Sequence, residues 1–172
     1  MTPGTTTGPR IVGPAEGKSV DLGSIGARMM IWTEETAAGG FSLVEHPMPP
    51  RRLAAPLHKH SREDEYSYVL EGTMGALLGD DVVHAEAGEF VFKPREQWHT
   101  FWNAGDEPAR ILEIIAPAGF EQFFAELAPL SAGGAPDPEA MGELCARYAL
   151  DMQPESVPGL CARFGLWFPG VE

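Results

Sequence analysis

Basic residues are scarce in this chain. Its 172 residues include 12 lysines and arginines against 25 aspartates and glutamates, which gives a formal net charge of -13 at pH 7. The basic residues are not gathered into a stripe that could bind phosphates. A protein of this charge repels the backbone of a nucleic acid, so we expect no nucleic-acid partner.

Long apolar runs and obvious cysteine pairs are also missing. The segment MTPGTTTGPRIVGPAEGK has no basic region followed by an apolar stretch, and the longest apolar run, residues 111–120, is interrupted by Glu113. These features predict a soluble cytoplasmic protein without a membrane span. Cys145 and Cys161 lie among apolar residues of helical spacing, and we expect free thiols rather than a disulfide.

The chain is long enough for one compact domain with appendages. Residues 1–27 begin with a segment rich in Gly, Pro and Thr and are expected to form an N-terminal arm. Residues 28–117 contain short apolar runs broken by Gly, Pro and Asp, including a predicted tight turn at 79–81. Many short strands joined by such turns are typical of a β-sandwich or barrel.

Residues 118–172 change to helical spacing and are expected to form a helical C-terminal extension. Asp137 can cap a helix that begins at Pro138 and continues to about Leu150, and residues 155–164 predict another. A further helix, predicted directly after Pro117, carries an apolar stripe that must pack on the barrel exterior or mouth. The stripe consists of Phe120, Phe123, Phe124 and Leu127.

Two histidines lie two residues apart in the segment His58-Lys59-His60. Residues two apart in a strand point to the same face, so both imidazoles would face one side with Lys59 turned away. If the chain turns and resumes as a strand at Glu65, its carboxylate comes within reach of the pair. A His-x-His pair alone is more often a surface feature than a metal site, so the assignment depends on further ligands.

His99 supplies the remaining ligand from a later strand-like run, where it shares a face with Phe101. Three imidazoles and one carboxylate suit Fe, Mn, Ni, Cu or Zn. The sequence therefore predicts one divalent transition metal, bound by His58, His60, Glu65 and His99.

The spacing around these ligands forms two motifs, His58-x-His60 followed by Glu65 and Gly72, and Gly88 followed by Pro94, His99 and Asn103. Together they resemble the two motifs of the cupin superfamily. Arg52 and Glu96 depart from that pattern, because the family usually has glycine at both positions. The glycines of the motifs and Asn103 are expected in turns, where they tolerate a positive φ.

The resemblance implies an all-β fold with an α-helical C-terminal tail, built as a single cupin barrel of the double-stranded β-helix or jelly-roll type. It also implies a metal-dependent dioxygenase, similar to small quercetinase-like enzymes, that acts on a small aromatic or enolic molecule, with Glu65 as both ligand and proton acceptor. A non-catalytic small-molecule binder or sensor and a metal-dependent isomerase remain alternatives, because cupins serve many functions.

Further residues are assigned by their position relative to the ligands. Phe101 is the first candidate for an apolar wall of a substrate pocket, followed by Ser67 and Val69 on the face of Glu65. His46 and His84 are predicted to be solvated strand or loop residues. On the strand that begins at Glu65, the face opposite to Glu65 is apolar and carries Tyr66, Tyr68 and Leu70. An exposed apolar face needs a cover, which predicts a homodimer.

Overall fold

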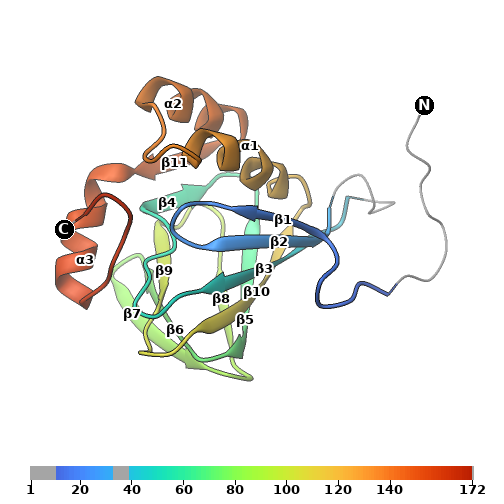
Figure 1. The fold of residues 1–172 in the computed structure, drawn as a ribbon, viewed down its shortest axis with the longest axis horizontal. Helices are drawn as coiled ribbons and strands as arrows, with labels where there is room; N and C mark the ends of the chain where they lie inside the picture. Colours follow the sequence, from blue (N-terminus) through green and yellow to red (C-terminus); the bar gives the residue numbers. More distant parts are fainter. Residues whose placement is uncertain (1–10, 33–38, 172) are drawn as a thin grey trace.

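The structure is a computed structural model that describes residues 11–32 and 39–171 (Figure 1). Two antiparallel sheets face each other and enclose a barrel. The strands are β1 (Lys18–Asp21), β2 (Gly26–Ile31), β3 (Ser42–Met48), β4 (Leu57–His60), β5 (Asp64–Glu71), β6 (Thr73–Leu78), β7 (Asp81–Glu86), β8 (Phe90–Lys93), β9 (His99–Asn103), β10 (Ala109–Ala116) and β11 (Leu150–Gln153). The helices are α1 (Glu121–Ser131), α2 (Pro138–Arg147), the 3-10 turn η1 (Pro154–Ser156) and α3 (Val157–Phe164).

The two sheets place alternate residues inside the barrel. One sheet has the order β1-β2-β3-β10-β5-β8 and the other the order β11-β4-β9-β6-β7. Because successive strand residues point to opposite faces, every second side chain is buried along β10 and along β5 from Glu65 to Val69. A cluster of buried apolar side chains fills the barrel, and it includes Met48, Val69, Met74, Phe101 and Ile111.

The strands and the turn expected from the sequence are confirmed. Leu78 pairs with Asp81 across the turn between β6 and β7. Strand β1, however, begins at Lys18, inside the segment 1–27 that was expected to form an arm, and pairs with β2. Residues 1–10 of that arm lie outside the described residues.

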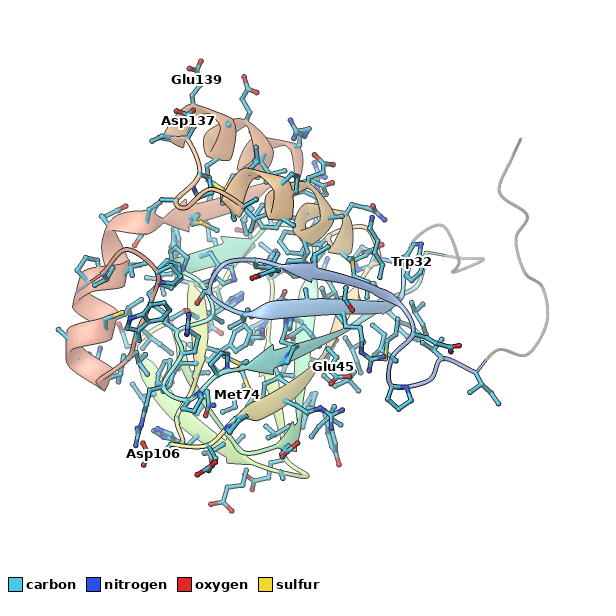
Figure 2. The ribbon with its side chains drawn as sticks, in the orientation of Figure 1. Trp32, Glu45, Met74, Asp106, Asp137 and Glu139 are labelled. Atoms are coloured by element: carbon cyan, nitrogen blue, oxygen red, sulfur yellow. The ribbon has the colours of Figure 1, made fainter. Side chains whose placement is uncertain are left out.

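The C-terminal extension covers one end of the barrel, as Figure 1 shows for α1 and α2. Phe120 and Phe123 are buried in a cluster with Ile115 of the barrel, so the predicted docking of the apolar stripe is confirmed. Asp137 caps α2 by accepting hydrogen bonds from the backbone N–H groups of Glu139 and Ala140 at 3.0 and 3.1 Å. Figure 2 shows Asp137 and Glu139 at the outer end of this helix.

The extension also contains a strand that the sequence analysis did not predict. Helix α2 ends at Arg147 instead of Leu150, and Ala149 has a φ of 51° that turns the chain. Leu150 then pairs with His60, and Met152 with His58, so β11 covers the free edge of β4. The segment after α2 therefore supports the strand that carries two of the predicted metal ligands.

Helix α3 packs on the outer face of the second sheet. The ring of Phe164 stacks on that of Trp102 at 4.4 Å. Trp102 in turn lies so close to Gly75 of the neighbouring strand that a Cβ atom there would be 2.2 Å from its ring. Both cysteines are free thiols, as predicted, and Cys161 lies on the buried side of this helix.

The outer face of β5 and β8 leaves large apolar side chains exposed, as the sequence predicted for β5. The exposed side chains are Tyr68, Leu70, Phe90 and Phe92. The homodimer expected from this face stays a prediction. Within the described part of the chain, no helix combines the length and the apolar character that crossing a membrane requires.

Candidate metal centre

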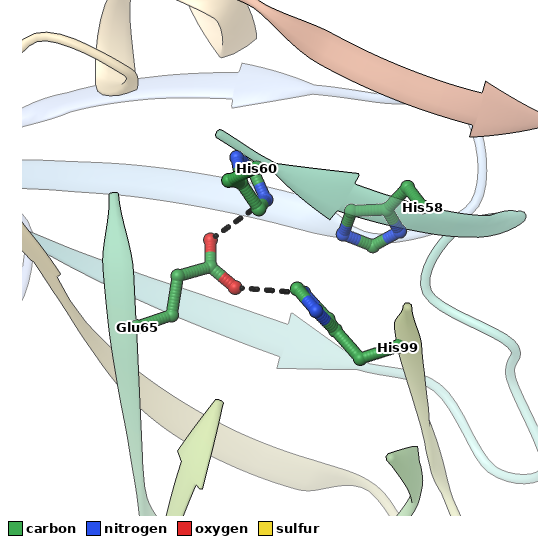
Figure 3. Close-up of side chains that lie close together, drawn as sticks. All are labelled: His58, His60, Glu65 and His99. Carbon is green, nitrogen blue, oxygen red and sulfur yellow. Dashed lines mark hydrogen bonds and ion pairs between the residues drawn. The ribbon is translucent and has the colours of Figure 1, made fainter. Parts of the chain in front are cut away.

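The four predicted ligands converge inside the barrel (Figure 3). His58 and His60 come from β4, Glu65 from the start of β5 and His99 from the start of β9. Their candidate ligand atoms all lie within 4.8 Å of one another. Ligands about 2.1 Å from a shared ion lie at most about 4.2 Å apart, so small side-chain movements would close the set around one ion.

Backbone carbonyls orient two of the imidazoles. The Nδ1 atom of His58 lies 2.8 Å from the carbonyl oxygen of Pro56, and that of His99 lies 3.0 Å from that of Gln97. A carbonyl oxygen only accepts, so each Nδ1 carries the proton and donates it. In the neutral ring the Nε2 atom then carries a free lone pair, which a metal ligand requires.

The facing atoms of His99 and Glu65 indicate that a cation fits between them. His99 Nε2 lies 3.2 Å from Glu65 Oε2. With Nδ1 protonated toward Gln97, a neutral His99 places one acceptor opposite another. A metal ion or a shared proton would satisfy both atoms. The ring nitrogens of His58 and His60, which face the same centre, favour the metal ion.

His60 supports the same interpretation. Its side chain is 1 % exposed, and neither ring nitrogen has a hydrogen-bond partner among the described residues. Buried polar atoms are normally satisfied, so an unpaired imidazole at a ligand position fits a missing metal bond. Nε2 lies 3.4 Å from Glu65 Oε1, and Nδ1 lies 3.8 Å from the buried carboxylate of Glu63.

The protonation states around the centre also suit a divalent ion. Burial lowers the pKa of His58 well below its ordinary value and that of His60 to about 4. Both imidazoles are therefore neutral at physiological pH, the state that binds a metal. Burial alone would raise the pKa of Glu65, but the ammonium group of Lys93 together with His60 and His99 outweighs this effect and holds the pKa well below its usual range.

A buried ion-pair network lies beside the centre, and the sequence analysis did not find it. Lys93 Nζ lies 2.8 Å from Glu65 Oε2 and 3.0 Å from Glu113 Oε2. The Ser67 hydroxyl donates to Glu113 at 3.0–3.1 Å, and burial raises the pKa of Glu113 to about 7. The available signal was a charged residue at an inward position of each apolar strand, Lys93 in β8 and Glu113 in β10.

Replacing Lys93 with methionine should strongly destabilise the metal-free protein. The substitution leaves the buried carboxylates of Glu65 and Glu113 without their cation, and breaking a buried pair in this way costs about 3–5 kcal/mol. Denaturant unfolding measures the effect. Arg95→Met is the matched control, because Arg95 pairs with Asp64 at the surface and exposed pairs contribute little. Equal unfolding midpoints for both variants would contradict the prediction.

A cavity of about 720 Å³ opens onto the centre between the barrel and the C-terminal extension. His58 and Glu65 form part of its wall. The other lining side chains are mostly apolar and include Phe101, Phe120, Phe123, Phe124, Leu127 and Met141. A concave apolar site of this size with a few polar groups is typical of small-molecule binding.

The structure places one of the three predicted pocket residues at the cavity and the other two away from it. Phe101 lines the cavity, but Ser67 and Val69 are not among the described residues that line it. Both are fully buried, Ser67 against Glu113 and Val69 in the barrel core. Their shared face with Glu65 is confirmed, but deeper positions in the barrel separate them from the cavity.

The prediction for His46 is wrong, while that for His84 is confirmed. His84 is exposed on β7. His46 is 2 % exposed and lines the cavity. The reason is that β3 lies inside its sheet between β2 and β10, so a polar residue on its inner face has no access to bulk solvent.

The two departures from the cupin motifs have a local explanation. Glu96 has a φ of 64°, the conformation that glycine would adopt, and its N–H donates to the carbonyl of His60 at 2.7 Å. At the other departure, Arg52, a positive φ is found in the preceding residue, Arg51, at 52°. Gly72 and Gly88 have positive φ as predicted.

Asn103 has a different role from the one expected. It lies in β9 and is not among the described residues with positive φ. Its side-chain amide donates to the carbonyls of Met48, Pro49 and Glu107. This asparagine therefore ties two loops to the end of β9.

Comparison with known proteins agrees with this fold. Residues 45–115 match the family model described as Cupin domain. The "Tetracenomycin polyketide synthase protein TcmJ" of Streptomyces glaucescens is 35% identical over 60 residues, which are 35% of this chain and 40% of that protein. "Polyketide synthase CurC" of Streptomyces cyaneus is 30% identical over 81 residues, 47% of this chain and 51% of that protein. The chain thus spans about half or less of these curated relatives.

Solved structures resemble the barrel at low sequence identity. KdgF from Halomonas sp. superposes with a TM-score of 0.58 at 15% identity, covering 67% of this chain and 99% of that one. A predicted oxalate decarboxylase from Thermotoga maritima gives 0.56 at 20% identity, covering 63% and 99%. The Streptomyces nucleoside dehydratase Pac13 gives 0.54 at 16%, covering 67% and 88%.

At these identities the structural likeness establishes the fold alone. The fold is that of the cupins, the double-stranded β-helix predicted from the sequence, and it carries a candidate metal site of three histidines and a glutamate.

Proposed function

We propose that this protein is a metal-dependent oxygenase that acts on a small aromatic or enolic molecule. The observation that carries the proposal is the junction of the ligand cluster with the apolar cavity, whose wall includes His58 and Glu65. Four protein ligands leave open positions on a six-coordinate ion, and open positions distinguish catalytic from structural metal sites. A molecule in the cavity would lie beside those positions.

The residues around the cavity favour a planar, weakly polar substrate. Phe101, Phe120 and Phe124 offer ring surfaces, and residues of the helical extension form part of the cavity wall. A divalent transition metal would act as a Lewis acid for an enolate or phenolate oxygen and, in a redox-active form, would allow reaction with dioxygen. Glu65 would accept the proton that the substrate hydroxyl loses on binding.

The curated relatives support a more specific substrate class. Both are named as polyketide synthase proteins, and aromatic polyketides carry the adjacent keto and phenolic oxygens that such a site would bind. The same relatives favour a second candidate function, which is a metal-dependent, redox-neutral conversion of a polyketide such as an isomerisation or ring closure. The two candidates share the site and differ in their use of oxygen.

Oxygen uptake separates these functions. Protein loaded in turn with Fe, Mn, Ni or Cu would be given a panel of flavonols, catechols, diketones and hydroxylated naphthoquinones, with dioxygen and substrate followed together. The proposal expects oxygen consumption that matches substrate loss. Substrate conversion without oxygen uptake would favour the redox-neutral enzyme. Saturable binding without any conversion would favour a non-catalytic binding protein.

A further inference from the structure

His46 is a fixed polar group in the cavity wall that the metal centre does not use. It lies on the inner face of β3, and its Nδ1 atom is 3.0 Å from the carbonyl oxygen of Gly26. The ring packs edge-on against Phe124 of α1 at 5.3 Å and lies 6.1 Å from the ring of Phe101. These contacts hold the imidazole in one orientation.

The second nitrogen of His46 is available to a ligand. Because Nδ1 donates to Gly26, the Nε2 atom of the neutral ring is an acceptor. Among the described residues, none donates a hydrogen bond to it. Burial lowers the pKa of His46 to about 4, so the ring is neutral at physiological pH. Because His46 forms part of the cavity wall, a ligand in the cavity could donate to this atom.

The carboxylate of Glu113 lies on the same inner wall. In the ladder between β3 and β10, His46 pairs with Ile111 and Val44 with Glu113. His46 and Glu113 are therefore diagonal neighbours on one face, about 7–8 Å apart. Both line the cavity that also reaches His58 and Glu65. The oxygens of Glu113 already accept from Ser67 and Lys93 beside the metal centre, whereas the Nε2 atom of His46 has no donor among the described residues.

We propose that His46 forms a second recognition point, whose Nε2 atom accepts a hydrogen bond from a hydroxyl group on a part of the substrate other than the oxygens that bind the metal. This inference rests on the proposed function and makes its substrate class narrower. The substrate is an aromatic molecule with at least two polar ends, one that binds the metal and one that donates to His46 Nε2. The apolar side chains between the two points contact its ring system.

Two variants of His46 test the recognition point. His46→Phe keeps a ring in place but removes the acceptor, whereas His46→Gln keeps an acceptor on a shorter, flexible side chain. Zn-loaded protein is used for binding, because Zn²⁺ has no redox chemistry and the probes are not consumed. The probes are unsubstituted flavonol and a flavonol with one hydroxyl group on its outer ring.

The wild-type protein should bind the hydroxylated flavonol more tightly than the unsubstituted one. His46→Phe should weaken binding of the hydroxylated probe by about tenfold, the typical effect of losing one buried hydrogen bond, and change binding of the unsubstituted probe less than about twofold. His46→Gln should recover part of the lost preference. Zn content and the unfolding midpoint of each variant show whether the centre and the fold are retained.

Three results would overturn the inference. Wild-type protein with no preference for the hydroxylated probe would do so, which needs no variant. Equal weakening of both probes by His46→Phe would show a packing role only, and unchanged binding of both would show no role. These outcomes are independent of oxygen uptake, so the recognition point can fail while the proposed oxygenase stands, and the reverse also holds.

Discussion

Replacing His60 or His99 with alanine should remove most of the bound metal. Each imidazole offers a nitrogen to the common centre, and each is 1 % exposed. Loss of an outer-shell partner alone typically costs about 10- to 100-fold in metal affinity, so loss of a direct ligand should cost more than about 100-fold. Elemental analysis after dialysis against a weak chelator measures the effect.

His84→Ala is the control for these two variants. It removes an imidazole of the same chain, but one that is exposed on β7, which β6 separates from the ligand strand β9. Its metal content should equal that of the wild-type protein. Equal metal content in the His60, His99 and His84 variants would exclude the assigned centre.

Glu65→Gln should slow turnover per bound metal ion by about 10²- to 10⁴-fold, the usual contribution of a group that transfers a proton. The amide can still offer an oxygen to a metal ion but cannot accept the proton from the substrate. Turnover and metal content are therefore measured on the same preparation. A residue that acts only as a ligand would lose metal and activity in proportion.

Glu71→Gln is the matched control for Glu65→Gln. It makes the same carboxylate-to-amide change at the other end of β5, where the side chain is exposed and only loosely paired with Arg110 at 3.8 Å. Its turnover should be unchanged. If turnover per metal ion in Glu65→Gln matched that of Glu71→Gln, Glu65 would have no role as a proton acceptor.

The ligand set could be predicted from the sequence because its geometry is local. His58 and His60 share a face by strand alternation alone, and the burial of Glu65, Ser67 and Val69 follows the same rule along β5. Gly72 and Gly88 both have a positive φ and lie in turns. Such turns depend on only a few neighbouring residues, so the sequence could indicate them. Helix α2 could also be predicted from a local signal, because Asp137 caps its first turn.

The polar groups around the centre depended on contacts between distant segments. Lys93 and Glu113 are 20 residues apart, and charged side chains are rarely buried unless paired. Each residue taken alone is therefore expected in solvent, and only the closed barrel brings them together. His46 was misplaced for a similar reason, because β3 also buries Glu45 on its other face and alternation could not identify the polar side.

The sequence by itself determined the barrel and the four candidate ligands, because strand alternation, turn residues and motif spacing act over a few residues. Only the tertiary structure showed what surrounds them. Strand β11 joins β4 across about 90 residues, and the cavity exists because the extension closes over the barrel mouth. Such long-range packing depends on which surfaces meet, and no local pattern specifies that.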